Sequence, residues 1–439
     1  MNTETLLALI QSLAENNGDF LTFSTTTNIT TNNSIISTTL NQYDDGRDGF
    51  FDGWWVYLNT ANNAGVLRKT GLPGTTTYDK TTGTLTVLGA ALAAESAAQT
   101  CYLFRYNRNR YKEAVIEACK QIYPALYKGV DDHTLTTGNI LPDNSFEAWS
   151  SSSAMTWYTA TSGTFTRSTS AMHGQYAAQY TAGQADDFFY VDSSTYPRLL
   201  DLQGKSVSFY CSANAQTADD AWIRIRTWSN DGTTTQTLKS TTSNPASNTV
   251  ILKLENQSIN DNLTKISFDF GVETNGQYVL FDCAHVSGLD VEEHLLPPAL
   301  VGGHVSQVKV QQSGHLSPPC YDWNCFNQTY PGKDTPFHLI NNGTNTYIRL
   351  DEAQSSGKRI RLTGYAPLET LSADTDTITV DAQRVPLLIA LAKYIFLKRQ
   401  LVPVSADDVA RVQNIIAQAY VDYKMGLMKH RMASPIELI

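Results

Sequence analysis

The sequence is poor in charge and contains no long apolar run. Charged residues make up 17% of the 439 positions, and 42 acidic against 32 basic side chains give a net charge of −10. The longest apolar stretches, such as 385–397, are shorter than the ~20 residues that a membrane-spanning helix needs, so we predict no membrane contact. Aromatic residues make up 10% of the chain, which excludes general disorder. The length predicts roughly two to four folded domains.

The sequence also lacks a basic stripe of the kind that follows a nucleic-acid backbone. Residues 131–290 hold 17 acidic and 8 basic side chains, a net of −9, so the rest of the chain sums to −1. The C-terminal residues 381–439 carry 8 basic against 5 acidic side chains, which is too sparse for a phosphate-binding surface. We therefore predict no DNA binding by charge. The net negative charge therefore lies almost entirely in residues 131–290, and the rest of the chain is nearly neutral.

Secretion signals and paired cysteines are also missing. The N-terminus has no basic segment and no cleavage site of small residues, so we predict synthesis in a reducing cytoplasm. Four of the six cysteines lie inside strand or helix patterns, where a free thiol behaves as a small apolar group. Cys320 and Cys325 are the one close pair, and their spacing allows a loop-closing disulfide or half of a zinc site. No second Cys or His pair follows at a matching distance, so neither is favoured.

The common signatures of catalysis are absent. The eight histidines are scattered, and there is no His-Glu-x-x-His, Gly-x-Ser-x-Gly or Gly-x-x-x-x-Gly-Lys-Ser/Thr motif. Adjacent acids such as Asp186 and Asp187, or Asp219 and Asp220, point to opposite faces of a strand. The two acids of a glycosidase must instead face each other ~5 to 10 Å apart. We therefore predict that the protein is not an enzyme.

Helical periodicity occurs at both ends of the chain and once between them. Apolar residues recur every three or four positions over 3–13, over 107–128 and over two C-terminal segments. Short alternating segments between these helices predict strands, and 131–138 is typical of a polar linker. The predicted fold is α+β and multidomain, a discontinuous helical bundle with inserted β-barrel or sandwich and jelly-roll domains. The expected parts are helices of the bundle at 1–17 and 107–130, a small β-barrel or sandwich domain at 18–106, a jelly-roll insert at 137–290, a β-strand region at 291–380, the C-terminal helices of the bundle at 381–431 and an extended tail at 432–439.

The acidic block has the order of landmarks found in a known β module. It opens on Leu-Pro-Asp-Asn-Ser-Phe-Glu-Ala-Trp at 141–149, continues through Gly-Gln-Tyr at 174–176 and closes with a strand at 278–286. This order resembles the jelly-roll carbohydrate-binding modules appended to glycoside hydrolases. The resemblance implies a structural calcium that ties the first strand to the last, held by Glu147, Asp282 and backbone carbonyls. The alternative is that both residues are ordinary surface acids and that no cofactor is bound.

One strand of this block has two different faces. In Ala-Trp-Ile-Arg-Ile-Arg-Thr-Trp at 221–228, side chains alternate across the strand, so Ile223 and Ile225 point to the core. The opposite face carries two indoles and two guanidiniums, which can stack on sugar rings and bind their hydroxyls. Stacking of arginine on tryptophan for its own sake, or a subunit contact, would use the same side chains. The glycan or interface candidates are Trp222, Arg224, Arg226 and Trp228.

Two further parts of the chain resemble proteins of tailed bacteriophages. Phe-Asp-Gly-Trp-Trp-Val-Tyr at 51–57, together with 63–68 and 82–87, is similar to a small β domain of tailed-phage virion proteins. The second resemblance is to phage head-to-tail connector, or adaptor, proteins, and it covers 359–368, 374–380 and the helix at 387–397.

The connector resemblance implies a place in the virion and a set of partners. Such adaptors form a homo-oligomeric ring, usually a dodecamer, beneath the portal protein, and they contact tail tube, nozzle or fibre proteins, while DNA only passes through the channel. A ring of identical subunits needs a heterologous interface that closes on itself. The resemblance also implies assembly in the bacterial host cytoplasm and a final location in the virion neck or tail. The expected portal-docking tail consists of Lys429, Arg431, Pro435, Ile436, Leu438 and Ile439.

The sequence leaves three functions open. The leading hypothesis is a structural virion protein, a connector ring that joins the portal to the tail, with a β insert that binds glycans or another virion protein. The alternative is a tail-associated carbohydrate-binding or host-adhesion protein, in which the helices serve only as an anchor. The third is a polysaccharide-degrading enzyme. Ring formation, glycan binding and release of reducing ends distinguish these three hypotheses.

Overall fold

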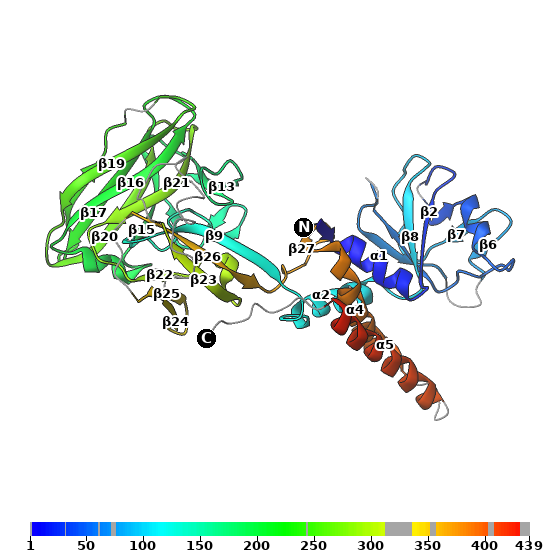
Figure 1. Ribbon diagram of the computed structural model, residues 1–439. Helices are drawn as coiled ribbons and strands as arrows, with labels where there is room; N and C mark the ends of the chain where they lie inside the picture. The colour runs from blue at the N-terminus through cyan, green and yellow to red at the C-terminus, as the bar shows by residue number, and fades with distance from the viewer. Residues whose placement is uncertain are drawn as a thin grey trace. The chain divides into compact units, whose positions relative to one another are not determined.

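The computed structural model describes residues 2–30, 32–59, 62–71, 76–242, 245–311, 336–351, 357–402 and 408–430 (Figure 1). The chain divides into two compact units. The terminal unit combines Met1–Lys128 with Pro367–Leu438, and the central unit contains Gly129–Ala366. Among the described helices, none is long and apolar enough to span a membrane.

Four helices of the terminal unit share one core, although they come from distant parts of the chain. The first begins where the Thr5 side chain accepts a hydrogen bond from the Ala8 backbone N–H at 3.1 Å. The rings of Tyr111 and Phe396 stack 4.2 Å apart and join the second helix to the third. Burial of these apolar faces stabilises the four helices more than helix propensity does. The helices are α1 (Leu6–Asn16), α2 (Arg108–Gln121), α4 (Val385–Gln400) and α5 (Asp408–His430), with the short η4 (Ala382–Arg384) before α4.

The β part of the terminal unit consists of two small antiparallel sheets and one strand pair. The sheets have the orders β2-β8-β4-β5 and β3-β7-β6, and they share a core in which the rings of Phe51 and Tyr78 meet 4.9 Å apart. The strand pair β1-β27 connects the N-terminal segment with residues just before α4. The elements are β1 (Asn2–Thr5), β2 (Phe20–Ser24), β3 (Ser34–Ile36), η1 (Thr38–Gln42), β4 (Trp55–Leu58), β5 (Val66–Lys69), β6 (Tyr78–Asp79), β7 (Thr84–Thr86), β8 (Thr100–Phe104) and β27 (Thr377–Val380).

The central unit is built on a sandwich of two five-stranded antiparallel sheets (Figure 1). The sheets have the orders β12-β15-β20-β17-β18 and β13-β14-β21-β16-β19, and phenylalanines from both meet in one core, with the rings of Phe189 from the first sheet and Phe281 from the second 5.4 Å apart. The elements are β10 (Trp149–Ser151), β11 (Ala154–Met155), β12 (Thr159–Ala160), β13 (Thr164–Ser168), β14 (Ala177–Thr181), β15 (Asp187–Asp192), η2 (Pro197–Leu202), β16 (Ser206–Ala215), β17 (Ala221–Ser229), β18 (Thr234–Lys239), β19 (Thr249–Ser258), β20 (Leu263–Val272) and β21 (Tyr278–Ser287).

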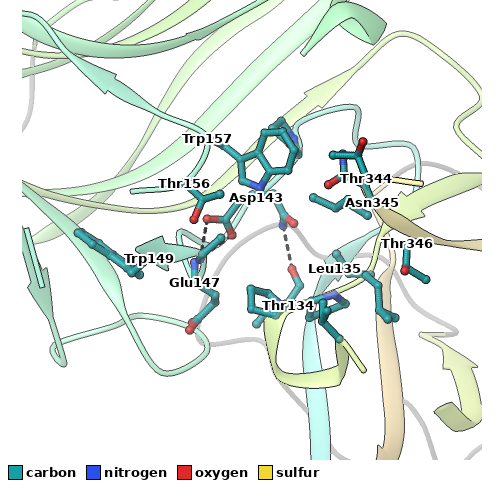
Figure 2. Close-up of a pocket in the computed structure, with 18 residues that line it drawn as sticks. Thr134, Leu135, Asp143, Glu147, Trp149, Thr156, Trp157, Thr344, Asn345 and Thr346 are labelled. Carbon is teal, nitrogen blue, oxygen red and sulfur yellow. Dashed lines mark hydrogen bonds between the residues drawn. The ribbon is translucent and has the colours of Figure 1, made fainter. Parts of the chain in front are cut away.

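Two three-stranded sheets complete the central unit around a second core. Their orders are β23-β26-β9 and β22-β25-β24. A pocket of about 400 Å³ is lined both by the sandwich and by residues of the second of these sheets (Figure 2). The elements are β9 (Lys128–Thr136), β22 (Glu293–Leu295), η3 (Pro298–Leu300), β23 (His304–Val310), β24 (Phe337–Asn341), β25 (Thr346–Leu350) and β26 (Arg359–Ala366).

The predicted polar linker at 131–138 is wrong, because most of this segment is strand β9. Its alternation is masked by acids that point outward: Asp131 binds the Arg361 guanidinium of β26 through two hydrogen bonds of 2.8 and 2.7 Å. The predicted helix at 3–13 begins later than expected, at Leu6, because the residues before it pair with β27. In both places a partner distant in sequence decides the local structure.

The structure describes four of the six cysteines and only Lys429 of the predicted portal-docking residues. Cys101, Cys119, Cys211 and Cys283 are free. Cys320 and Cys325 lie outside the described residues, as do Arg431 and the predicted tail at 432–439. Lys429 lies in the last turn of α5.

Candidate functional site

The predicted two-faced strand is β17, and it lies next to the centre of the sheet β12-β15-β20-β17-β18. Ile223 and Ile225 are fully buried in the sandwich core, as predicted. The face of the sheet that points away from this core is called here the outer face. Its members from three adjacent strands are Phe188, Tyr190, Trp222, Arg224, Arg226, Trp228, Lys265 and Asp269, joined by Lys239 of β18.

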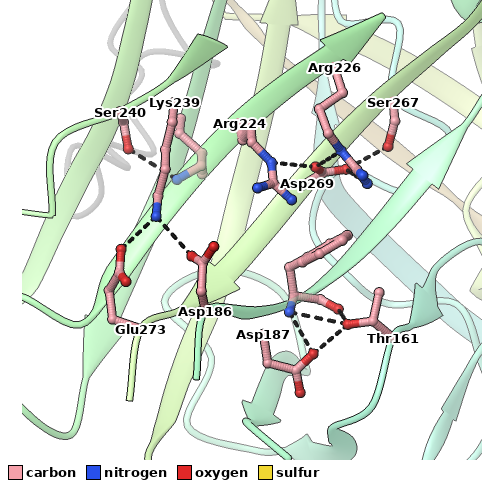
Figure 3. Close-up of polar contacts among 12 residues, drawn as sticks. Thr161, Asp186, Asp187, Arg224, Arg226, Lys239, Ser240, Ser267, Asp269 and Glu273 are labelled. Carbon is pink, nitrogen blue, oxygen red and sulfur yellow. Dashed lines mark hydrogen bonds and ion pairs between the residues drawn. The ribbon is translucent and has the colours of Figure 1, made fainter. Parts of the chain in front are cut away.

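Asp269 organises the outer face (Figure 3). Its carboxylate is fully buried and accepts hydrogen bonds from the Arg224 Nε at 2.8 Å and from the Arg226 Nε and Nη2 at 2.5 and 3.1 Å. The Ser267 hydroxyl donates a further bond of 2.5 Å. A buried carboxylate needs such partners, because an unpaired charge is costly away from water. The two guanidiniums are thereby fixed in place.

The guanidiniums stack on the rings around them. Arg224 lies 4.5 Å from the centre of the Phe188 ring and 4.6 Å from that of Trp222. Arg226 lies 4.6 Å from the Phe188 ring and 5.0 Å from the Trp228 ring. Planar cations favour this arrangement over aromatic faces. The four residues predicted from the sequence do lie together, and Phe188 of β15 completes their stack.

Trp222 does not offer a ring to a ligand, which corrects one part of the prediction. Its side chain has 0% exposure. The indole lies over Gly271, where an added Cβ would approach it to 2.0 Å, and the Lys239 ammonium covers it at 4.2 Å. Because Gly271 has no side chain, the Trp222 indole lies flat against the sheet, beneath other side chains of the outer face. The alternation of side chains along β17 correctly placed Trp222 on the outer face. The burial of Trp222, however, depends on residues of other strands.

Besides charged side chains, the outer face exposes three aromatic rings. Phe188, Tyr190 and Trp228 are partly exposed, and the rings of Phe188 and Tyr190 are 6.1 Å apart. The Lys265 ammonium lies 5.8 Å from the Tyr190 ring and 5.0 Å from the Trp228 ring. The sequence reasoning missed Phe188 and Tyr190. Their spacing of two in Asp-Phe-Phe-Tyr-Val-Asp was the signal that could have identified them.

Cations and acids balance on the outer face. Lys239 binds Asp186 at 2.8 Å and Glu273 at 2.6 Å, as Figure 3 shows. Lys265 binds Asp192 at 2.7 Å. Together with the two arginines on Asp269, four cations meet four carboxylates. The face therefore has no net charge that would select a charged ligand.

Of the predicted calcium ligands, Asp282 is a buried carboxylate and Glu147 is a half-buried one. Glu147 Oε1 accepts from the Gln175 backbone N–H at 2.7 Å, and Asp282 Oδ2 accepts from the His173 backbone N–H at 2.8 Å. Burial raises the pKa of Glu147 to about 8, and the negative charges of Asp143 and Asp282 add to this effect. Burial also raises the pKa of Asp282 to about 7.

Among the described residues, no cation compensates either carboxylate, and this is the feature that fits a divalent ion. Within the described residues there is no group of three His, Cys, Asp or Glu side chains that could hold a metal. A calcium ion here would therefore need backbone carbonyls, as the resemblance implies. The calcium site stays a prediction.

No protein-family model matches the chain, and no curated protein matches it in sequence. Solved structures match parts of it. The C-terminal family 22 carbohydrate-binding module of Clostridium thermocellum Xyn10B is 13% identical and covers 35% of this chain and 95% of its own, with a TM-score of 0.29. The CBM22-1 xylan-binding domain of Paenibacillus barcinonensis Xyn10C is 14% identical and covers 37% of this chain and 99% of its own, with a TM-score of 0.27.

A phage protein is also among the similar structures. The enzymatically active domain of bacteriophage CBA120 tailspike protein 4 is 11% identical, covers 36% of this chain and 21% of its own, and has a TM-score of 0.26. At these identities and TM-scores, the likenesses carry no argument about ligand or function. The functional argument therefore rests on the residues of the outer face.

Proposed function

We propose that the central unit binds neutral glycans on its outer face. The observation that supports this most is the row of three partly exposed rings, Phe188, Tyr190 and Trp228, on one sheet face. The C–H face of a sugar ring packs on aromatic rings, and rings that are already fixed lose little conformational freedom on binding. The balance of four cations and four acids favours an uncharged ligand.

Polar groups for sugar hydroxyls lie beside these rings. Within the part of the chain that the structure describes, the Tyr190 hydroxyl and the Trp228 indole N–H have no hydrogen-bond partner. Arg226 uses Nε and Nη2 on Asp269, which leaves Nη1 for a ligand. A sugar hydroxyl both donates and accepts, so it can satisfy each of these groups. Rings and donors together form a surface suited to a saccharide chain.

Binding without hydrolysis is part of the proposal. A glycosidase needs one carboxyl group that can give a proton and a second one that faces it. Asp269 is enclosed by two guanidiniums, and the other three acids of the face bind lysines. Each acid of the face is therefore already paired with a cation, which does not match the pair of facing carboxyl groups of a glycosidase.

Glycan binding can be tested on the full chain. A glycan array should identify a neutral oligosaccharide, whose affinity is then measured by calorimetry for wild type, Trp228→Ala and Tyr190→Ala. Each variant should weaken binding by about tenfold, which corresponds to roughly 1.4 kcal/mol. Tyr43→Ala is the matched control, because Tyr43 is an aromatic residue of the terminal unit with 48% exposure. The proposal fails if no neutral glycan binds, or if the control weakens binding as much as Trp228→Ala.

A second candidate function is the connector, and helix α5 is the observation that favours it. Val421, Met425 and Met428 have exposures of 47%, 55% and 88%, and their spacing places them on one face of the helix. Exposed apolar faces of this kind are typical of protein contact sites. In a connector this face would contact a neighbouring copy or the portal protein of a virion neck.

Electron microscopy tests the connector hypothesis. The protein mixed with its portal protein should add a ring of density, and Met425→Asp with Val421→Asp should abolish the ring without lowering the melting temperature. Deletion of 432–439 should weaken portal association if the predicted tail docks there. An unchanged ring in the double variant would exclude α5 as the contact.

A further inference from the structure

Figure 2 shows the pocket of the central unit, whose lining residues differ from those of the outer face. It has a volume of about 400 Å³, which is within the ordinary range of small-molecule sites. Its walls come from three parts of the chain, namely 134–157, which runs from the end of β9 into the sandwich, 295–301 around η3, and 344–346 before and in β25. It shares no residue with the outer face. Glycan binding on the outer face therefore does not account for this pocket.

Two tryptophans give the pocket a fixed apolar wall. Trp149 donates its indole N–H to the Phe146 carbonyl at 2.7 Å, and its ring packs on Phe165 at 6.2 Å. Trp157 packs edge-on against the Tyr196 ring at 5.7 Å. Both indoles are partly exposed and line the pocket. Packing on one side fixes each ring, so the ligand meets a preformed surface.

The opposite wall is polar and equally fixed. Figure 2 shows Thr344 and Asn345 across the pocket from Thr156 and Trp149. The turn that carries them is closed by hydrogen bonds from the Asn345 and Thr344 backbone N–H groups to the Asn342 side chain, at 2.7 and 3.0 Å. Within the described residues, the Asn345 amide group and the Thr344 hydroxyl make no hydrogen bond. These groups are free to bind ligand hydroxyls.

The charge of the lining limits the ligand further. Asp143 and Glu147 line the pocket, and its described lining includes no Lys, Arg or His. The Asp143 carboxylate is held by the backbone N–H groups of Glu147 and Ala148, each at 2.9 Å. At neutral pH the Asp143 carboxylate is charged, because its pKa is about 6, so a site that contains it and no base repels anions. Acidic sugars are therefore excluded, whereas neutral and amino sugars are not.

We propose that this pocket binds the end of a neutral or amino-sugar saccharide, about one or two rings in size. The indole of Trp157 packs on the C–H face of the terminal ring, and Asn345 and Thr344 bind its hydroxyls. The outer face is open along the sheet and takes an internal stretch of a chain, whereas a pocket of about 400 Å³ has room for only the end of one. The two sites are independent, so one can exist without the other.

Small sugars test the pocket in the full chain. The probes are N,N′-diacetylchitobiose, lactose and glucosamine, with glucuronic acid as the anionic control, and binding is measured by calorimetry and by ligand-observed NMR. At least one neutral or amino probe should bind with a Kd in the millimolar range or tighter, and glucuronic acid should bind at least about tenfold more weakly. Trp157→Ala should lower the affinity about tenfold, and Asn345→Ala about fivefold.

Matched variants separate the pocket from the outer face. Trp228→Ala removes an indole of the outer face and should leave these affinities unchanged. Asn345→Ala changes an exposed turn, so it tests the pocket even if Trp157→Ala does not fold. If Trp228→Ala abolishes binding and Trp157→Ala does not, the outer-face proposal stands and the pocket proposal is wrong. The reverse result supports the pocket and leaves the outer face to be decided by its own test with longer neutral glycans. The pocket proposal is also wrong if no probe binds the wild type, or if a proline-rich peptide binds there and sugars do not.

Discussion

The outer face and the pocket belong to the same unit but are specified in different ways. The outer face is made of alternate residues on three adjacent strands, and their register sets each neighbour, as in the row Phe188, Gly271 and Trp222. The pocket is made of segments far apart in the sequence, which meet only because the sandwich packs beside the β22-β25-β24 sheet. A site on one sheet is determined by how its strands pair, whereas a site between two sheets is determined by how the sheets pack against each other.

The electrostatics of the two regions differ as well. Every acid of the outer face binds a cation, with Asp269 held by two. The pocket region contains Asp143 and Glu147, for which the described residues provide no cation, and burial raises the pKa of Asp143 to about 6. We therefore expect the pocket side to respond to protons and metal ions. Four experiments test this contrast.

The largest effect is expected from Asp269→Ala. This change leaves the Arg224 and Arg226 guanidiniums, with side-chain exposures of 10% and 22%, without their shared partner. Removal of one member of a buried ion pair costs about 3–5 kcal/mol, measured as the free energy of unfolding in urea. The control is Glu255→Ala, which removes an exposed pair with Lys253 and should cost less than about 1 kcal/mol. Equal costs for both variants would mean that the charge network does not stabilise the outer face.

The second effect concerns His294 of β22, at the junction beside the pocket. Burial lowers the pKa of His294 from 6.5 to about 4, and Arg198 adds to this effect. Between pH 6.5 and 4 the unfolded chain therefore binds more protons at this site than the folded protein does, so stability falls as the pH falls. Relative to His294→Gln, the wild type should lose roughly 3 kcal/mol of unfolding free energy across this window.

The comparison with the variant is necessary because nearby acids act in the opposite direction. Raised pKa values at Asp143, Glu147 and Asp282 favour the folded state at low pH, and this contribution is lost as the pH rises through the folded values. Only the difference between wild type and His294→Gln isolates the histidine. A difference that stays constant from pH 7 to pH 4 would show that His294 is not held neutral.

The third experiment adds calcium. If Glu147 and Asp282 hold the ion, calcium at about 100 times its Kd should stabilise the wild type by about 2.7 kcal/mol, seen as a higher melting temperature. Glu147→Gln should lose this response. With EDTA, however, the variant should be at least as stable as the wild type, because it removes a half-buried carboxylate with a raised pKa. A wild type with the same melting temperature in calcium and in EDTA would rule the calcium site out.

The smallest effect is expected from Gly271→Ala. The new methyl group would lie 2.0 Å from the Trp222 indole, so the ring must move off the sheet. Overpacking of this kind costs about 1–3 kcal/mol and should change the tryptophan fluorescence. Gly426→Ala of α5 is the control, because its methyl group would meet only the end of the Leu387 side chain at 3.3 Å. If Gly271→Ala is as well tolerated as the control, Trp222 is not held flat.

The sequence predicted parts of the outer face correctly for a physical reason. Side chains alternate along any strand, so the pattern at 221–228 was enough to place Ile223 and Ile225 in the core. The same pattern could not give the exposure of Trp222, which is covered by Lys239 of the next strand and lies over Gly271 of another. Phe188 and Tyr190 were missed because their strand pairs with β20, and the sequence does not show that pairing.

The pocket could not be predicted from local patterns. Trp149 marked the start of the jelly-roll resemblance, but nothing near it in the sequence points to Asn345. Strand β9 was taken for a linker because its neighbour β26 lies more than two hundred residues away in the chain. A junction of this kind depends on long-range packing, which no local pattern records.

By itself, the sequence determined the helical segments, the alternating strands and the location of the acidic charge. Each of these follows from the period of side chains along one segment or from a simple sum of charges. Tertiary structure alone decided which rings are exposed, which acids share a cation and where a pocket opens. Those properties depend on contacts between segments distant in the chain, because burial and charge pairing are set by neighbours in space.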